Sequence, residues 1–449
     1  MAYNKILLIP SNWANYEKKA FRFFFIYFLI QVLPIEASFW QHLFSTNWLN
    51  IQYRDIFYLS RYQPQFLPDG FGFANWGIVA FIAAVGTVIW NYLDAERTEY
   101  DALYYWLRVL VRYRLAIGVI AYGFIKFFPL QAPPPSLSNL NTNYGDFGAW
   151  KLFSLSLGVV PDYQSFLGLV EIVGGLLLLH RKTATIATLI ILPFAGNVFF
   201  SNLAYEGGEY VYSGYLISLA LFLFAFDAVR LFKAVSLERP TLPNKFNPVF
   251  TENWQKIGRI ALKSAFVFFF VALYGFKTYS GYNKGQYQFP TKAGLPNTEG
   301  VYDVSEFRLK NETIPYSKTD PNRWQDVVFE KWNTISIKSN RPVILETAKT
   351  EEIYKDDADR KYELANTQGR HYYSYDVDAA KQTLTLKNRN SNHAKETLVL
   401  NYKKAENGAI VLSGINENRD SVYAVLNKLD KKYLLLEAQK TGRRRGLKL

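Results

Sequence analysis

The sequence predicts an α-helical integral membrane protein with about seven transmembrane helices, followed by a C-terminal all-β domain that forms an antiparallel sandwich or barrel. Two observations predict this fold class. Up to about Tyr279 the chain is a series of apolar runs, long enough with their flanks to cross a hydrocarbon core of about 30 Å. Beyond that point the sequence becomes polar, and short segments alternate between apolar and polar residues as half-buried strands do.

The predicted spans cover residues 21–40, 73–92, 112–130, 166–179, 184–200, 210–231 and 257–279. Lysine and arginine gather in alternate loops, which places the N-terminus in the cytoplasm and the C-terminal domain in the periplasm. Arg54 and Arg61 in the first outer loop are the exceptions. The segment between the second and third spans, 94–114, is basic and partly amphipathic, so we expect it to lie at the cytoplasmic interface. Residues 131–160 contain one cation, Lys151, and are expected to form a translocated loop.

The composition excludes several kinds of site. The chain has no cysteine, which excludes disulfides, thiol-based redox chemistry and iron–sulfur ligation. Its four histidines lie in different segments, so we expect no metal site. The formal net charge of +13 is typical of cytoplasmic loops that face anionic lipid, and no recognition motif indicates nucleic acid as a partner. No nucleotide-binding or hydrolase motif occurs, and the sequence leaves open whether the protein is an enzyme.

An ionisable residue inside a predicted span is the strongest indication of a site. Glu171 lies near the middle of the fourth span, where a carboxylate is costly unless it is protonated, paired or hydrated. Gly168 and Gly175 share its helix face and would let a neighbouring helix come close. Lys126, about one turn from the outer end of the third span, is the expected partner. A lysine stem can cover the difference in depth, which is roughly 6 Å at the helical rise.

Three further polar residues are expected around this pair on its outer-leaflet side. Tyr122 precedes Lys126 by one helical turn, Asn197 lies near the outer end of the fifth span, and Asn202 follows that span. We therefore expect a ligand-binding pocket in which Lys126 contacts an oxygen or anion, Glu171 exchanges a proton and Asn197 orients the ligand. The structural alternative is that Lys126 extends to the interface and Glu171 is an inert, buried hydrogen-bonding group.

The C-terminal part predicts eight or nine short strands. The candidate strands are residues 301–309, 324–329, 334–337, 372–377, 383–386, 397–402, 409–412, 422–426 and 433–436. Turn residues separate them, as at 407–408, and this spacing favours an antiparallel sandwich or barrel. The final residues, GRRRGLKL, are expected to be disordered.

Residues 114–235 resemble the DoxX-like family of bacterial four-helix membrane proteins. The segments RLAIGVIAYGFIKFFPLQ, FLGLVEIVGGLLLLHRKTATIATLIILPFAGNVFFSN and YSGYLISLALFLFAFDAVRLF carry the likeness. The positions that match the family pattern are Lys126, Glu171, Gly174, Gly175, Asn197 and Asn202. The resemblance implies a four-helix bundle in the inner membrane, and the family takes its name from a subunit associated with thiosulfate:quinone oxidoreduction. This chain adds helices on both sides and a β-domain, and it lacks cysteine.

These observations predict four parts: N-terminal helices in 1–104, the bundle in 105–235, a cytoplasmic linker and last helix in 236–281, and the periplasmic β-domain in 282–449. The preferred hypothesis is an inner-membrane DoxX-like protein that binds a small amphiphile, a quinone or a lipid, without a covalently bound cofactor. It would be an accessory subunit of a larger envelope or redox complex, with membrane lipid and a protein as partners. The alternatives are a membrane-anchored scaffold whose β-domain docks a partner and a transporter of a small solute.

Overall fold

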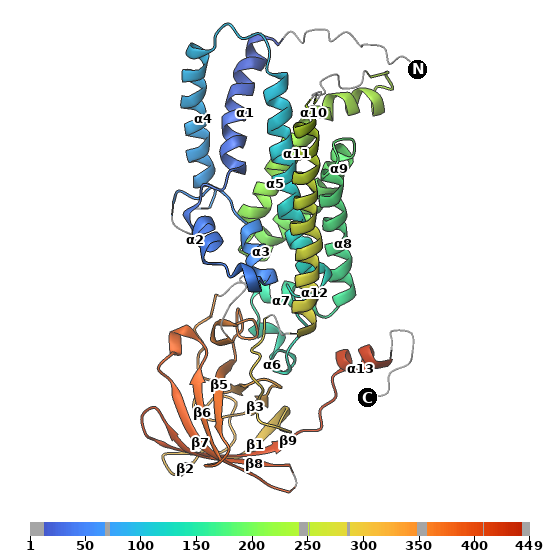
Figure 1. The fold of residues 1–449 in the computed structure, drawn as a ribbon. Helices are drawn as coiled ribbons and strands as arrows, with labels where there is room; N and C mark the ends of the chain where they lie inside the picture. The colour runs from blue at the N-terminus through green and yellow to red at the C-terminus, as the bar shows by residue number, and fades with distance from the viewer. Residues whose placement is uncertain are drawn as a thin grey trace. The chain divides into compact units, whose positions relative to one another are not determined.

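The computed structural model describes residues 13–67, 72–241, 250, 252–284, 288–347, 357–406 and 408–441. The chain divides into two compact units (Figure 1). The helical unit comprises Met1–Phe128 and Ser165–Gly281, and the barrel unit comprises Pro129–Gln164 and Tyr282–Leu449. The predicted disordered tail, 442–449, and Asn407 of the predicted turn lie outside the described residues.

The helical unit is built from long helices with short connections. Its helices are α1 (Asn15–Val32), α2 (Ala37–Ser45), η1 (Trp48–Asn50), α3 (Tyr53–Ser60), α4 (Ala74–Leu93), α5 (Asp101–Phe127), α8 (Pro161–Leu178), α9 (Ala184–Ala204), α10 (Tyr210–Val235), α11 (Asn253–Val267), the π-helical segment η3 (Phe268–Leu273) and α12 (Tyr274–Lys284). Helix α1 packs against α4 and α5, and α10 packs against α9 and α5. Figure 1 shows α1 and α4 side by side at one edge of the unit.

Five helical stretches among the described residues are long and apolar enough to cross a membrane. They are Asn15–Ser45, Ala74–Leu93, Ala184–Ala204, Tyr210–Val235 and Asn253–Lys284. They correspond to five of the seven predicted spans. The other two, α5 and α8, form as helices but carry more polar side chains, among them Arg108, Arg114 and Lys126 on α5 and Glu171 on α8.

Two helix boundaries differ from the sequence prediction. The first span was expected to be continuous over 21–40, but α1 ends at Val32 and α2 begins at Ala37. Pro34 explains the break, because it has no amide N–H and its ring clashes with a preceding helical turn. Residues 94–114 were expected at the cytoplasmic interface. Most of this segment is the first half of α5, and its Leu107 and Val111 are buried in the helical unit.

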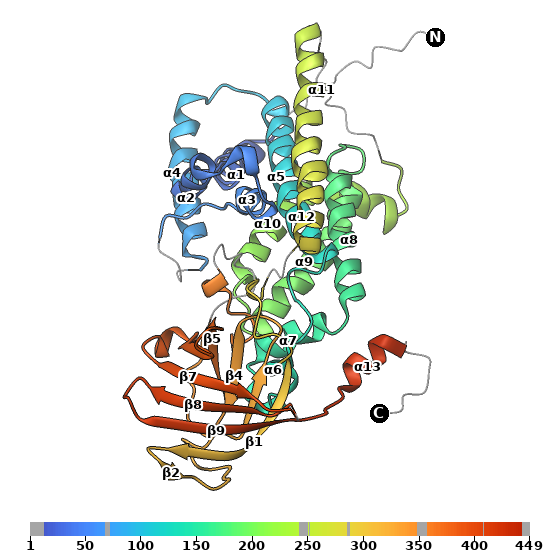
Figure 2. The same cartoon turned by 60° about the horizontal axis from the view of Figure 1, so that its bottom comes forward.

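The barrel unit contains one antiparallel sheet of nine strands among the described residues. The strands are β1 (Gly300–Leu309), β2 (Glu312–Thr313), β3 (Asp326–Phe329), β4 (Thr334–Lys338), β5 (Arg370–Asp378), β6 (Thr383–Asn388), β7 (Thr397–Lys404), β8 (Ile410–Asn416) and β9 (Ser421–Lys428). From β3 to β9 each strand pairs with the next, and β1 pairs with both β3 and β9, which closes an eight-stranded barrel. Figure 2 shows the closing strands β8, β9 and β1 side by side. The two-residue strand β2 extends β1 as a hairpin.

The barrel interior is filled by side chains. Inward-facing residues such as Val327, Ile335, Leu384, Leu400 and Leu426 form one buried core. This is the usual outcome for eight strands, whose interior is just wide enough for side chains. Of the two predicted architectures, the barrel is the one that forms.

One predicted strand is wrong. Residues 433–436 belong to a helix, α13 (Leu434–Thr441), whose residues LLLEAQKT have high helix propensity. The other eight predicted strands overlap β1 and β3–β9. A short 3-10 turn at Asp357–Asp359 and another at Ser391–His393 complete this part of the unit.

Residues 129–164 pack on the outside of the barrel. The sequence places most of them in a loop of domain 105–235, but they form α6 (Leu137–Leu140), η2 (Tyr144–Asp146) and α7 (Ala149–Gly158) and belong to the barrel unit. Side chains alternate along β4, so Thr334 and Ser336 face away from the core that contains Ile335. Both are nevertheless buried, and Ser336 lies 2.8 Å from the Ser138 hydroxyl of α6.

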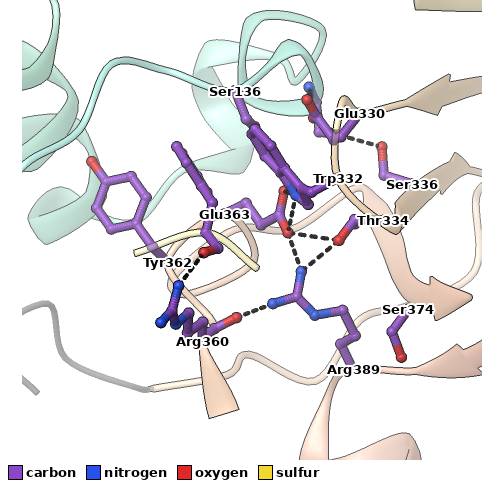
Figure 3. A network of polar contacts seen from close by, with 12 residues as sticks. Ser136, Glu330, Trp332, Thr334, Ser336, Arg360, Tyr362, Glu363, Ser374 and Arg389 are labelled. Carbon is purple, nitrogen blue, oxygen red and sulfur yellow. Dashed lines mark hydrogen bonds and ion pairs between the residues drawn. The ribbon is translucent and has the colours of Figure 1, made fainter. Parts of the chain in front are cut away.

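A network of buried polar groups covers this outer face (Figure 3). The Glu363 carboxylate is fully buried and forms an ion pair with Arg389. It also accepts hydrogen bonds from Trp332 Nε1 at 3.1 Å and from Thr334 Oγ1 at 3.0 Å. Since the charge is paired and both carboxylate oxygens have donors, the network stabilises the packing of the 357–367 segment on the barrel.

A second buried carboxylate holds α6. Glu330 accepts bonds from the Ser138 amide at 2.7 Å, from the Ser138 hydroxyl at 2.6 Å and from the Leu137 amide at 3.2 Å. Burial, and then the negative charge of Glu363, raise the pKa of Glu330 to about 7, from an ordinary value of 4.5. The folded protein therefore holds this proton more tightly than the unfolded chain does.

We expect Glu330→Gln to remove part of the pH dependence of stability. Between pH 4.5 and 7 the folded state binds more protons at this site than the unfolded state, so the contribution of Glu330 to the unfolding free energy falls as pH rises. Over this range the contribution of Glu330 to the unfolding free energy changes by on the order of 3 kcal/mol. Thermal unfolding of both proteins, followed by tryptophan fluorescence from pH 5 to 8, should show the variant gaining stability relative to wild type with rising pH. A constant difference across this range would contradict the assignment.

Candidate functional site

Helices α5 and α8 approach each other closely because small residues line their crossing. A Cβ atom added to Gly168 would lie 2.2 Å from the Phe127 amide nitrogen and 2.5 Å from the Gly123 carbonyl oxygen. Both neighbours are backbone atoms, so no side-chain movement could relieve the clash. The sequence prediction that Gly168 permits close helix approach beside Glu171 is confirmed.

This crossing brings Lys126 and Glu171 together. Lys126 Nζ lies 2.6 Å from Glu171 Oε1, and the two side chains are only 10% and 9% exposed. The other oxygen, Oε2, is buried and has no hydrogen-bond partner among the described residues. Lys126 Nζ also lies 5.5 Å from the ring centroid of Phe194 on α9. The predicted pairing is therefore confirmed, and it leaves one carboxylate oxygen unsatisfied in apolar surroundings.

A second carboxylate, Glu209, lies next to this pair. It precedes α10, is only 7% exposed and forms an ion pair with Arg61. The Tyr122 hydroxyl donates to Glu209 Oε2 at 3.0 Å. Glu209 was not predicted as a site residue, because the turn that contains it includes no cation that could pair with it. The one available signal was Arg61, a cation in a loop expected to face the periplasm.

Aromatic and cationic groups surround Tyr212 of α10. Its ring centroid lies 5.5 Å from that of Tyr122 and 6.0 Å from the Arg61 guanidinium carbon. On its other side, its hydroxyl lies 3.4 Å from Arg114 Nη2. The site thus joins three cations, two carboxylates and two tyrosines.

These groups border a narrow cavity of about 40 Å³. Its polar lining is formed by Tyr122, Lys126, Glu171, Glu209, Tyr212 and Ser213. Its apolar lining is formed by Val119, Val170, Ile190, Ile191, Phe194, Ala195, Val198 and Leu216. This volume is enough for about three water molecules, so it admits the polar end of a ligand and not a whole ring system.

The structure brings three of the five predicted site residues to this cavity: Tyr122, Lys126 and Glu171. Asn197 is exposed on α9 and does not line it. The reason is helical geometry, since Val198 lines the cavity and the preceding residue points about 100° away. Asn202 holds the turn instead: its amide donates to the Val198 carbonyl at 2.9 Å, and its oxygen accepts from the Glu209 amide at 3.2 Å.

The arrangement has the chemistry of a binding site for a polar group. Lys126 can donate hydrogen bonds, Glu171 Oε2 can accept one, and the phenol of Tyr122 can do both. No cluster of metal-ligating side chains occurs within the described ranges.

We expect Gly168→Ala to destabilise the helical unit and to separate Lys126 from Glu171. The added methyl group would meet the α5 backbone, and overpacking of this kind costs about 1–3 kcal/mol. Gly196→Ala on α9 is the matched control, because nothing lies within 4 Å of its added Cβ. Thermal unfolding should show a lower midpoint for Gly168→Ala and an unchanged or raised midpoint for Gly196→Ala. Equal midpoints for the two variants would show that α5 and α8 do not approach each other closely at Gly168.

Comparison of the chain with protein-family models, with curated proteins and with solved structures finds no match.

Proposed function

We propose that this chain is a bacterial inner-membrane protein, similar to the DoxX-like family, that binds the polar end of a small amphiphile, a quinone or a lipid, in its helical unit. The proposal includes seven membrane spans, a cytoplasmic N-terminus and a periplasmic barrel unit. The observation that carries it is the Lys126–Glu171 ion pair, which lies in apolar surroundings beside a cavity and has one carboxylate oxygen free.

The outward faces of the helices support a membrane environment. On α4, Phe81, Val85, Val88 and Ile89 are all exposed. Large exposed apolar areas of this kind are rare on soluble monomers and common where lipid or a partner covers the surface.

Helix α8 shows the same distribution despite its charged residue. Phe166, Leu169, Val173 and Leu176 recur at helical spacing and are between 39% and 56% exposed, whereas Glu171 is 8% exposed. A helix whose outer stripe is apolar and whose carboxylate points inward is suited to lipid. This distribution supports α8 as a span although its mean composition is more polar.

We assign a role to each group of the site. Lys126 contacts an oxygen or an anion of the ligand, and Glu171 accepts a hydrogen bond or exchanges a proton through Oε2. The orienting role goes to Tyr122 and not to Asn197, because Tyr122 lines the cavity. The apolar body of the amphiphile would lie against the wall that includes Phe194 and Val198, while only its polar end enters the cavity.

The proposal assigns any electron-transfer centre to a second protein. A chain without cysteine has no thiol or iron–sulfur centre of its own. We therefore propose an accessory subunit of a larger envelope or redox complex, with the barrel unit as its docking module.

We expect ligand binding to depend on the ion pair. Mass spectrometry of the purified full chain should find a quinone or a lipid bound to wild type, and at least about tenfold less in Lys126→Met. The loss follows from removing a charge-assisted hydrogen bond, which contributes about 1.5–3 kcal/mol. Lys263→Met is the matched control, because Lys263 is exposed on α11.

The outcomes separate the alternatives. Equal occupancy in all three proteins would contradict the pocket and leave the scaffold hypothesis, in which the helices only anchor the barrel unit. Uptake of a solute into proteoliposomes that depends on Glu171 would favour transport over static binding.

A further inference from the structure

One buried cation near the cavity has no counter-ion. Arg114 of α5 is 2% exposed, and its Nε and Nη1 atoms have no hydrogen-bond partner among the described residues. Its Nη2 donates to the Tyr62 carbonyl. No described carboxylate lies close enough to form an ion pair with it, although buried charges in proteins are generally paired.

Aromatic rings compensate this charge only in part. The guanidinium carbon lies 4.0 Å from the ring centroid of Tyr62 and 5.2 Å from that of Tyr215. Such cation–π contacts stabilise a guanidinium, but they carry no opposite charge. The rings therefore stabilise the Arg114 guanidinium but do not neutralise its positive charge.

The charges around the site sum to a positive value. Lys126 is paired with Glu171, and Arg61 is paired with Glu209. Arg114 adds a third cation to these two neutral pairs. In a medium of low dielectric an excess charge attracts an opposite one strongly, because little solvent screens it.

Arg114 lies directly behind one wall of the cavity. Its Nη2 is 3.4 Å from the hydroxyl of Tyr212, which lines the cavity. A Cβ atom built on Gly118 would lie 3.3 Å from Arg114 Nη1, 2.9 Å from the Tyr212 hydroxyl and 2.8 Å from Leu216 Cδ2. Since Tyr212 and Leu216 both line the cavity, the unpaired charge lies one side chain away from it.

We infer that the amphiphile bound at this site carries a negatively charged oxygen group, a carboxylate or a phosphate, at its polar end. This inference rests on the proposed function and specifies its ligand. The anion would accept a hydrogen bond from Lys126 Nζ, and Arg114 behind Tyr212 would supply the charge that the two ion pairs do not neutralise. Arg114 is thus a positioning and charge-balancing residue, not a group that touches the ligand.

The test compares matched probes on the purified full chain. Native mass spectrometry would measure the occupancy by oleate, monododecyl phosphate and oleyl alcohol at equal concentrations. Wild type should bind at least one anionic probe about tenfold more than the alcohol, whose apolar chain matches that of oleate. Preference for oleate alone would identify a fatty acid as the source of the anion, and preference for the phosphate alone would identify a phosphorylated lipid.

Variants then assign the preference to Arg114. Arg114→Gln should lower the occupancy by the anion about tenfold and leave that by oleyl alcohol unchanged, and Arg114→Lys should retain the preference. Arg259→Gln, which removes an exposed cation of α11, should behave as wild type. If Arg114→Gln fails to fold, the ratio of anion occupancy to alcohol occupancy in wild type still tests the inference. Equal binding of alcohol and anions by wild type overturns the inference and leaves the proposed function intact, whereas binding of no probe and no natural amphiphile overturns both.

Discussion

The ion pair between Lys126 and Glu171 is the interaction on which the helical unit depends. Removing two charges from water is expensive, and their attraction repays this cost only when the geometry is close. Gly168 permits that geometry, because no larger residue would let α8 approach the α5 backbone. The pair in turn keeps both charges inside the unit, so that beyond its first turn the outer face of α8 presents apolar side chains such as Phe166 and Leu169. One small residue therefore makes the difference between a buried ion pair and a carboxylate on the outer face of α8.

The second carboxylate shows why a cavity remains beside the pair. Glu209 is held from three directions, by Arg61, by the Tyr122 hydroxyl and by Asn202 through its backbone amide. These contacts fix the start of α10 and hold Tyr122 on one side of the cavity. Because Glu209 already has its own cation, it does not compete with Glu171 for Lys126. The Lys126–Glu171 and Arg61–Glu209 ion pairs are therefore formed by different partners. The cavity that Lys126, Glu171 and Glu209 line is left for a polar group.

Periodic features of the structure could be predicted from the sequence, and contacts made by loops could not. Eight strands follow from alternation, and the Lys126–Glu171 pair follows from the depth of each residue in an apolar helix. By contrast, Arg61 and Glu209 are separated by 148 residues and both lie outside the helices, where no periodicity relates them. The error at Asn197 has the same origin, since depth along a helix was predictable and the direction of the side chain around it was not. Residues 131–160 were predicted as a loop because their folding depends on contacts with the barrel, such as the hydrogen bonds from Ser138 to Glu330, which no local pattern reveals.

The central buried carboxylates of the two units, Glu363 and Glu171, differ in how completely they are satisfied. In the barrel unit, the Glu363 carboxylate has a cation and donors on both oxygens, so nothing further could bind without breaking a contact. In the helical unit, Glu171 Oε2 has no donor and Arg114 has no ion-pair partner among the described residues. Unsatisfied buried polar groups cost free energy that the fold would otherwise avoid. The two groups have opposite charge, and Glu171 lines the cavity while Arg114 lies behind its lining residue Tyr212. A single ligand group with a negative oxygen, held where Lys126 can also reach it, would lower the cost of Arg114 without displacing Glu171 from its partner.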